Sequence, residues 1–277
     1  MEGAYDRTAL WLPLLRELTE RHPGWAIWKN VDSAFAGTGD VDSLGPPEDW
    51  DAIRAVFEAW AARNGLGPVI VCRHIPQGPH YLALDPDSPF LVQLDVKQCG
   101  TWRGSTLVDD RDLQALSERD ERGFRRVRPG AEGVIKLLMN GTRRGGGANE
   151  EGLRTKRVAE LLAADPAGAT AATRLVGPAR RPLQRGIDAV VAGRWDLAAM
   201  RRVEAWCLAR SLLEPRTALS RLWFLYHLAP RCPVVTLIRD HDRIVPEDRD
   251  GWLAEVARDH EVVTTPGGRD PRRAPYG

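Results

Sequence analysis

The sequence predicts an α+β fold in which a mixed β-sheet with flanking helices is followed by a helical domain and a small C-terminal βαβ segment. In the first hundred or so residues, short apolar runs that suit strands alternate with segments of helical periodicity. Helical periodicity dominates from about residue 109, and strand-like runs return near the C-terminus. We therefore expect three parts, residues 1–108, 109–230 and 231–277.

The first part is predicted to begin with a helix, because Leu10, Leu14 and Leu18 recur at helical spacing, and Pro23 and Gly24 end it. Further elements follow from apolar runs and turn residues. Strands are expected at residues 25–28, 69–72, 80–84 and 90–96, a helix at 46–64 and a hairpin turn at 85–89.

The second part is predicted to be entirely helical. Its helices are expected at residues 109–117, 129–138, 149–164, 182–192, 197–213 and 217–228. In the third part we expect strands at 234–238 and 261–265 around a helix at 250–258, packed on the helical domain, and a frayed tail from residue 266.

Composition excludes several classes of protein. With 43% hydrophobic and 28% charged residues, the chain suits a packed core, and its net charge of +1 gives no strong overall field for nucleic acid or membrane. The four cysteines lie far apart and show no C-x-x-C spacing, which argues against a zinc site. The chain has no apolar leader and no long uncharged apolar stretch, so we expect a cytoplasmic protein without a membrane partner.

The segment from Gly39 to Leu44 carries the most informative motif, Asp40-Val41-Asp42. Residues i and i+2 of a strand point to the same face, which places two carboxylates side by side. Their mutual repulsion favours an intervening cation, and carboxylate oxygens suit Mg²⁺. The alternative is that the Asp-x-Asp pair only caps a turn or faces solvent.

A third acid, Asp95, stands in an otherwise apolar predicted strand, where a carboxylate is costly to bury without a partner. If this strand neighbours the Asp40–Asp42 segment, three carboxylates converge in the arrangement used for metal-assisted phosphoryl or nucleotidyl transfer. The alternative is a structural ion pair of Asp95 with Lys97 or Arg73.

The order of elements resembles that of the nucleotidyltransferase superfamily, which has the DNA polymerase β-like fold. This order is a helix, a short strand, a polar loop, the Gly-Asp-x-Asp motif, a second helix and a later strand with a solitary acid. The matching pieces are Lys29-Asn30, Gly39 to Asp42, Asp95 and Trp102-Arg103-Gly104, within a resemblance that covers about residues 8–177. It implies a metal-dependent transfer of a nucleoside monophosphate from a nucleoside triphosphate such as ATP. Asp40, Asp42 and Asp95 would hold Mg²⁺ or Mn²⁺, and the acceptor would be a small molecule, a sugar, a protein or a tRNA end.

The sequence departs from the family at the triphosphate. The usual Gly-Ser or Gly-Gly pair is absent, and Lys29-Asn30 stands in its place about ten residues before Asp40. We expect Asn30 or Ser33 to replace the lost contacts, Lys29 to neutralise a phosphate, and Gly39 to lie at the triphosphate. The departure also supports a second hypothesis, a non-catalytic nucleotide- or RNA-binding module that retains the fold.

Basic residues concentrate between Arg122 and Arg157, where ten of them face three acids for a local net charge of +7. We expect Lys136, Arg143 and Arg144 to neutralise phosphate charge, with Arg143-Arg144 on a mobile loop before three glycines. The alternative is a solvated helical face. A P-loop is excluded, because its motif is absent from the sequence.

A rival hypothesis comes from the Asp240–Asp242 segment and His260, which resemble the late acid loop and histidine of α/β-hydrolases. The sequence contains no G-x-S-x-G nucleophile motif, so it lacks the serine that acyl transfer requires. We therefore favour the nucleotidyltransferase interpretation.

Overall fold

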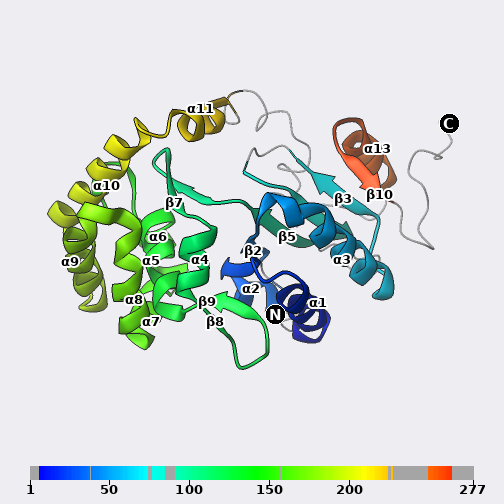
Figure 1. The fold of residues 1–277 in the computed structure, drawn as a ribbon, viewed down its shortest axis with the longest axis horizontal. Helices are drawn as coiled ribbons and strands as arrows, with labels where there is room; N and C mark the ends of the chain where they lie inside the picture. Colours follow the sequence, from blue (N-terminus) through cyan, green and yellow to red (C-terminus); the bar gives the residue numbers. More distant parts are fainter. Residues whose placement is uncertain are drawn as a thin grey trace. The chain divides into compact units, whose positions relative to one another are not determined.

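The computed structural model describes residues 6–37, 39–73, 77–84, 91–155, 157–223, 226 and 249–263. The chain divides into two compact units (Figure 1). Unit 1 comprises Met1–Trp25, Asn30–Gln98 and Leu222–Gly277, and unit 2 comprises Ala26–Lys29 and Cys99–Arg221. The predicted α+β class with a mixed sheet is confirmed.

Unit 1 contains the mixed sheet on which the candidate site lies. Its strands are β2 (Val41–Leu44), β3 (Val69–Cys72), β4 (His80–Leu84), β5 (Leu91–Lys97) and β10 (Glu261–Val263), in the spatial order β10-β3-β4-β5-β2. β2 pairs with β5 in parallel, whereas the β10–β3, β3–β4 and β4–β5 pairs are antiparallel. Its helices are α1 (Thr8–Arg21), α2 (Val31–Phe35), α3 (Trp50–Arg63, after the 3-10 turn Pro47–Asp49) and α13 (Arg249–Asp259).

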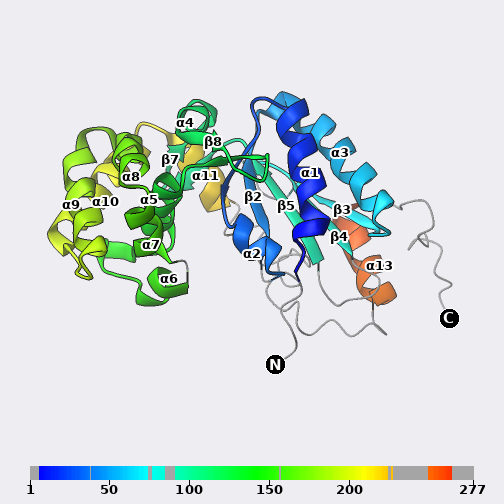
Figure 2. The same ribbon diagram turned by 90° about the horizontal axis from the view of Figure 1, so that it is seen from below.

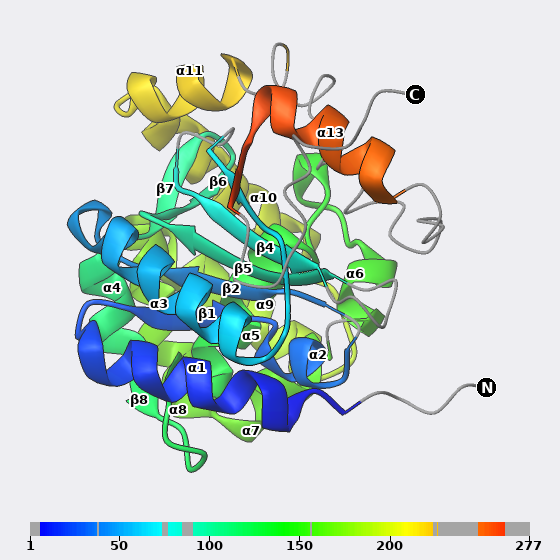
Figure 3. The same ribbon diagram turned by 90° about the vertical axis from the view of Figure 1, so that its right-hand side faces the viewer.

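Two long helices, α1 and α3, cover one face of this sheet (Figures 2 and 3). Their apolar stripes meet where the buried rings of Trp11 and Trp60 stack with centroids 5.3 Å apart. Phe57 of α3 contacts Tyr81 of β4, which joins the helix pair to the sheet. The predicted helices that begin near Leu10 and after Pro46 are therefore confirmed.

The opposite face of the sheet is covered at one end by α13 (Figure 3). Leu253 and Val256 of this helix pack on Ile70, Leu82 and further buried residues of β3 and β4. β10 continues the sheet beside β3, and Arg54 of α3 holds Glu261 with two hydrogen bonds of 2.9 and 2.6 Å. The expectation that the C-terminal segment packs on the helical domain is thus wrong for its described residues, since their apolar side chains complete the core of unit 1.

Unit 2 is mainly helical but contains strands. Its strands are β1 (Ala26–Lys29), β6 (Gly100–Trp102), β7 (Ser105–Val108), β8 (Ser117–Arg119) and β9 (Arg125–Val127). Its helices are α4 (Asp110–Leu116), α5 (Pro129–Met139), α6 (Glu150–Thr155), α7 (Val158–Ala164), α8 (Pro166–Ala172), α9 (Arg180–Val191), α10 (Leu197–Ser211) and α11 (Pro215–Trp223, which extends past Arg221), with 3-10 turns at Arg144–Gly146 and Thr173–Ala179. Around the buried helix α5 pack α7 and α8 (Figure 1).

Two expectations for this part of the chain are corrected. The segment predicted to be entirely helical contains β8 and β9, and β9 pairs in parallel with β1 through Ile27 and Arg126. Strands of three residues are too short to show a period of two in the sequence. The helix predicted at 149–164 is two helices, because Arg157 adopts the left-handed conformation with φ 48°.

Several predicted features lie outside the described residues. These are the strand at 234–238, the acid segment at 240–242, the turn at 85–89 and the tail from residue 266.

Candidate metal centre

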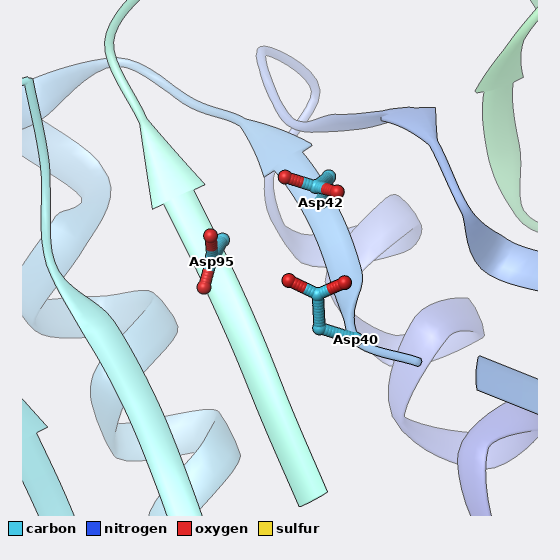
Figure 4. A group of neighbouring side chains, drawn as sticks. All are labelled: Asp40, Asp42 and Asp95. Atoms are coloured by element: carbon cyan, nitrogen blue, oxygen red, sulfur yellow. The ribbon is translucent and has the colours of Figure 1, made fainter. Parts of the chain in front are cut away.

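The three predicted carboxylates lie together on unit 1. β2 and β5 are parallel neighbours with Asp42 directly opposite Asp95, so both side chains project from the same face. Asp40 precedes β2, and its carboxylate turns toward the other two (Figure 4). One oxygen from each residue lies within 4.8 Å of the others. The convergence that the sequence predicts is present in the described structure.

The carboxylate of Asp42 is buried and fixed by Asn30. Asp42 is 2% exposed, and its Oδ2 accepts a hydrogen bond of 2.6 Å from the Asn30 side-chain amide. Asn30 precedes α2 with φ 71°, a left-handed conformation that asparagine tolerates better than most residues. The loop between β1 and α2 therefore positions one oxygen of Asp42.

Asp95 is buried, and three side chains donate hydrogen bonds to it. Its Oδ1 lies 2.5 Å from His80 Nδ1 and 2.6 Å from Gln93 Nε2, and its Oδ2 lies 3.0 Å from Lys97 Nζ. Lys97 Nζ also lies 3.5 Å from Asp42 Oδ1. Burial by itself opposes ionisation, but the charges of His80 and Lys97 outweigh it and hold the pKa of Asp95 well below its ordinary value. Burial likewise opposes the charge of Lys97, and Asp95 and Asp42 outweigh it and raise the lysine pKa.

Three members of this cluster were not assigned to the site from the sequence. Gln93 and Lys97 flank Asp95 at i−2 and i+2, so the period of a strand places all three on one face. The two-residue period of the strand is therefore a sequence signal that identifies Gln93 and Lys97 as neighbours of Asp95. His80 was not identifiable in this way, because it faces Asp95 only through the antiparallel register of β4 and β5. Of the two partners considered for Asp95, Lys97 is the observed one, whereas Arg73 pairs with Asp51 at 3.0 Å.

Comparison with protein-family models, curated proteins and solved structures finds no match to this chain. The candidate site is therefore interpreted from its own geometry. Within the described ranges, no helix combines the length and the apolar character needed to cross a bilayer.

Two further predicted residues, Ser33 and Gly39, lie beside each other in unit 1. Ser33 is half-buried in the first turn of α2, and Gly39 is exposed directly before Asp40. A side chain at Gly39 would bring its Cβ to 3.0 Å from the Cβ of Ser33, so the glycine permits a close approach of the loop to α2. Both residues thus flank the segment that carries Asp40.

The other predicted phosphate-binding residues belong to unit 2. Lys29 ends β1, with its ammonium 5.1 Å from the ring centroid of Trp28. Lys136 is a buried residue of α5 whose Nζ lies 2.6 Å from Glu132, and Arg126 contacts the same carboxylate at 2.5 Å. Within its unit, Lys136 is therefore part of a buried ion-pair network.

Arg143 and Arg144 are exposed at the start of the glycine-rich segment. The loop expected to be mobile is held from two sides, because Trp195 donates to the carbonyl of Gly146 at 2.9 Å and Arg201 to that of Gly145 at 3.1 Å. The Arg143 guanidinium itself lies 3.5 Å from the side-chain oxygen of Asn149.

Part of the basic excess between Arg122 and Arg157 is balanced by acids just outside that range. Asp120 pairs with Arg122 at 2.8 Å, and Asp165 pairs with Arg128 at 2.6 Å. The local net charge of +7 therefore overstates the positive charge of this surface, because the fold brings neighbouring carboxylates onto it.

The Trp102-Arg103-Gly104 segment is the tip of the β6–β7 hairpin in unit 2. Arg103 and Gly104 both have positive φ, 53° and 84°, as the tight turn requires. The Arg103 guanidinium lies 2.6 Å from the buried Glu204 of α10. Within its unit, this arginine links the hairpin to α10.

Proposed function

We propose that this chain is a metal-dependent nucleotidyltransferase that moves a nucleoside monophosphate from a nucleoside triphosphate to an acceptor hydroxyl or phosphate. The observation that carries the proposal is the meeting of Asp40, Asp42 and Asp95 oxygens within 4.8 Å. A set of hard carboxylate oxygens on one face of a sheet suits Mg²⁺ or Mn²⁺, which usually bind one or two carboxylates together with substrate phosphates.

Each side chain of the cluster has a role in this proposal. Asp40, which is the most accessible of the three acids, would hold the ion together with Asp42 and Asp95. An ion held there would polarise the phosphate oxygens and orient the triphosphate for in-line displacement. Asp95 accepts hydrogen bonds from His80, Gln93 and Lys97, and its lowered pKa favours a role in holding and positioning the ion over one as a base toward the acceptor hydroxyl.

The reaction proposed is a substitution at the α-phosphorus of the triphosphate. An acceptor oxygen forms a bond to this phosphorus, and the bond from the phosphorus to the bridging oxygen of the β-phosphate breaks. The bridging oxygen leaves as part of pyrophosphate, and the acceptor proton passes to solvent. In this proposal Asn30 or Ser33 would replace the contacts of the Gly-Ser pair of the family that the sequence resembles, and Gly39 lies directly before Asp40.

The test is pyrophosphate release from each nucleoside triphosphate in Mg²⁺ or Mn²⁺, with candidate acceptors that include tRNA. Asp42→Asn preserves the shape of the side chain but removes its charge, and we expect it to reduce release to background. Asp51→Asn is the matched control, since Asp51 is 85% exposed and pairs only at the surface with Arg73. Equal activity of the wild type and Asp42→Asn would exclude catalysis at this site.

A second candidate function is a nucleotide- or RNA-binding module without catalysis. It is favoured by the hydrogen bonds from His80, Gln93 and Lys97, which stabilise the Asp95 charge without a metal ion. Nucleotide binding that is independent of divalent metal, with no pyrophosphate release, would support this candidate. For RNA, affinity should fall steeply as salt concentration rises, and a flat salt response would contradict RNA binding.

A further inference from the structure

Lys97 is the cationic side chain that reaches into the carboxylate cluster from its own strand. It follows Asp95 by two residues on β5 and projects from the same face. Its ammonium lies 3.0 Å from Asp95 Oδ2 and 3.5 Å from Asp42 Oδ1, and its side chain is 19% exposed. One lysine thus bridges an acid of β5 and an acid of β2.

This position gives Lys97 a counter-ion role. Three carboxylates within 4.8 Å repel one another when all are ionised, and two of them are almost fully buried. An opposite charge within about 4 Å stabilises the ionised form of each neighbour. The lysine can therefore hold the cluster together when no metal ion is bound.

A metal ion that joins Asp42 to Asp95 would need the oxygens that Lys97 contacts. Asp95 Oδ1 already accepts hydrogen bonds from His80 and Gln93, and Asp42 Oδ2 accepts one from Asn30. The other two oxygens, Asp95 Oδ2 and Asp42 Oδ1, are those nearest the ammonium. The flexible four-carbon stem of lysine lets the ammonium move aside when another cation takes these oxygens.

We propose that Lys97 is an internal cation that competes with divalent metal for the Asp40–Asp42–Asp95 cluster. The inference rests on the proposed function, because it concerns the metal site of that function. It adds that Lys97 neutralises part of the carboxylate charge before metal arrives, and that metal binding requires the displacement of the Lys97 ammonium.

The experiment measures Mn²⁺ binding to the full chain without nucleotide, by electron paramagnetic resonance of the free ion. Lys97→Met removes the charge and keeps an apolar stem, whereas Lys97→Arg keeps the charge. Removal of a competing unit charge at this distance should tighten Mn²⁺ binding by about tenfold or more. Lys97→Arg should bind Mn²⁺ about as the wild type does.

The outcomes separate the two proposals. If the wild type binds Mn²⁺ and Lys97→Met binds it no more tightly, competition by Lys97 is overturned and the metal site stands. If only Lys97→Met binds Mn²⁺, competition is supported, and pyrophosphate release by the wild type separately decides whether the proposed function stands. If neither protein binds Mn²⁺, competition by Lys97 is overturned, and an absence of pyrophosphate release would be needed to overturn the proposed function as well.

A thermal-unfolding cycle in metal-free buffer tests the counter-ion role without a metal. Lys97→Met should lower the melting temperature markedly in the wild type but little in an Asp95→Asn background, where the cluster carries one negative charge fewer. Equal losses in both backgrounds would overturn the counter-ion role. If Lys97→Met by itself is unfolded, the counter-ion role predicts that the double variant Lys97→Met, Asp95→Asn folds. A double variant that is also unfolded would overturn the counter-ion role.

Discussion

Asn30 donates its side-chain amide to Asp42 Oδ2 across 2.6 Å, and it does so from a left-handed backbone conformation with φ 71°. The residue both turns the chain into α2 and orients a carboxylate of the candidate metal centre. The first role depends on the backbone conformation of Asn30 and the second on its side-chain amide, so substitutions can distinguish the two roles.

We expect Asn30→Gly to lower the free energy of unfolding by about 1.5–3 kcal/mol, since it removes a hydrogen bond to a buried charged group. Asn30→Ala should cost about 1 kcal/mol more, because alanine also strains the left-handed backbone that glycine accepts. Urea denaturation of the two variants and the wild type measures both differences. Equal stability of the two variants would show that the backbone of Asn30 is not under this constraint.

Gly100 is expected to be intolerant of any side chain. A Cβ at this position would lie 2.5 Å from the Trp28 ring and 2.7 Å from Val108 within the core of unit 2. Gly100→Ala should therefore destabilise the protein by about 1–3 kcal/mol through overpacking.

Gly147→Ala provides the control for that substitution. Gly147 has φ −69°, and no heavy atom lies within 4 Å of a Cβ added there. Its stability should stay within about 0.5 kcal/mol of the wild type in thermal or urea unfolding. A similar loss for both alanine variants would contradict the packing explanation for Gly100.

The Asp165 carboxylate should make the stability of unit 2 depend on pH. Burial opposes its ionisation, but hydrogen bonds from Arg128 and from the backbone amides of Gly168 and Gly130 outweigh this and lower the pKa of Asp165. A lowered pKa contributes stability that is complete above the unfolded-state value of about 3.9. This contribution is lost as the pH falls through the lowered folded-state pKa.

Asp165→Asn tests this dependence, because asparagine caps α8 about as well as aspartate but carries no charge. Urea denaturation at a series of pH values below about 5 should give a shallower loss of stability for the variant than for the wild type. An identical slope in both proteins would show that another acid governs this range.

Leu253 of α13 is expected to stabilise unit 1. It packs in the buried cluster with Ile70 and Leu82, so Leu253→Ala should cost about 2–5 kcal/mol. Hydrogen exchange should increase in β3 and β4, whereas α5 in unit 2 should retain its protection. The exposed Arg258 of the same helix supplies a control, since Arg258→Ala removes no buried apolar surface. Faster exchange confined to α5 would contradict the assignment of α13 to unit 1.

Some of the candidate site could be predicted from sequence because its signals are local. Asp40 and Asp42 stand two residues apart beside a glycine, and Asp95 is the acid in an apolar strand. These features follow from the alternation of a strand and the cost of burying a charge. The role of His80 could not be predicted, because it depends on how β4 and β5 are aligned.

The helices that were predicted correctly have long apolar stripes, as in α1 and α3, or clear boundaries such as the Pro129 that opens α5. The elements missed include the short helices α2 and α8, the hairpin strands β6 and β7, the three-residue strands β8 and β9, and the break at Arg157. A strand of three residues is too short to show the two-residue period of a β-strand. In addition, β1, which pairs with β9, lies far from it in the sequence.

The sequence by itself determined which segments are apolar, where the long helices begin and end, and which acids are costly to bury, because these properties depend on neighbours along the chain. The tertiary structure decided that Asp42 faces Asp95, that Lys97 bridges them and that α13 completes the core of unit 1. These relationships depend on strand register and on contacts between segments distant in sequence, and both are set by the packing of the whole unit.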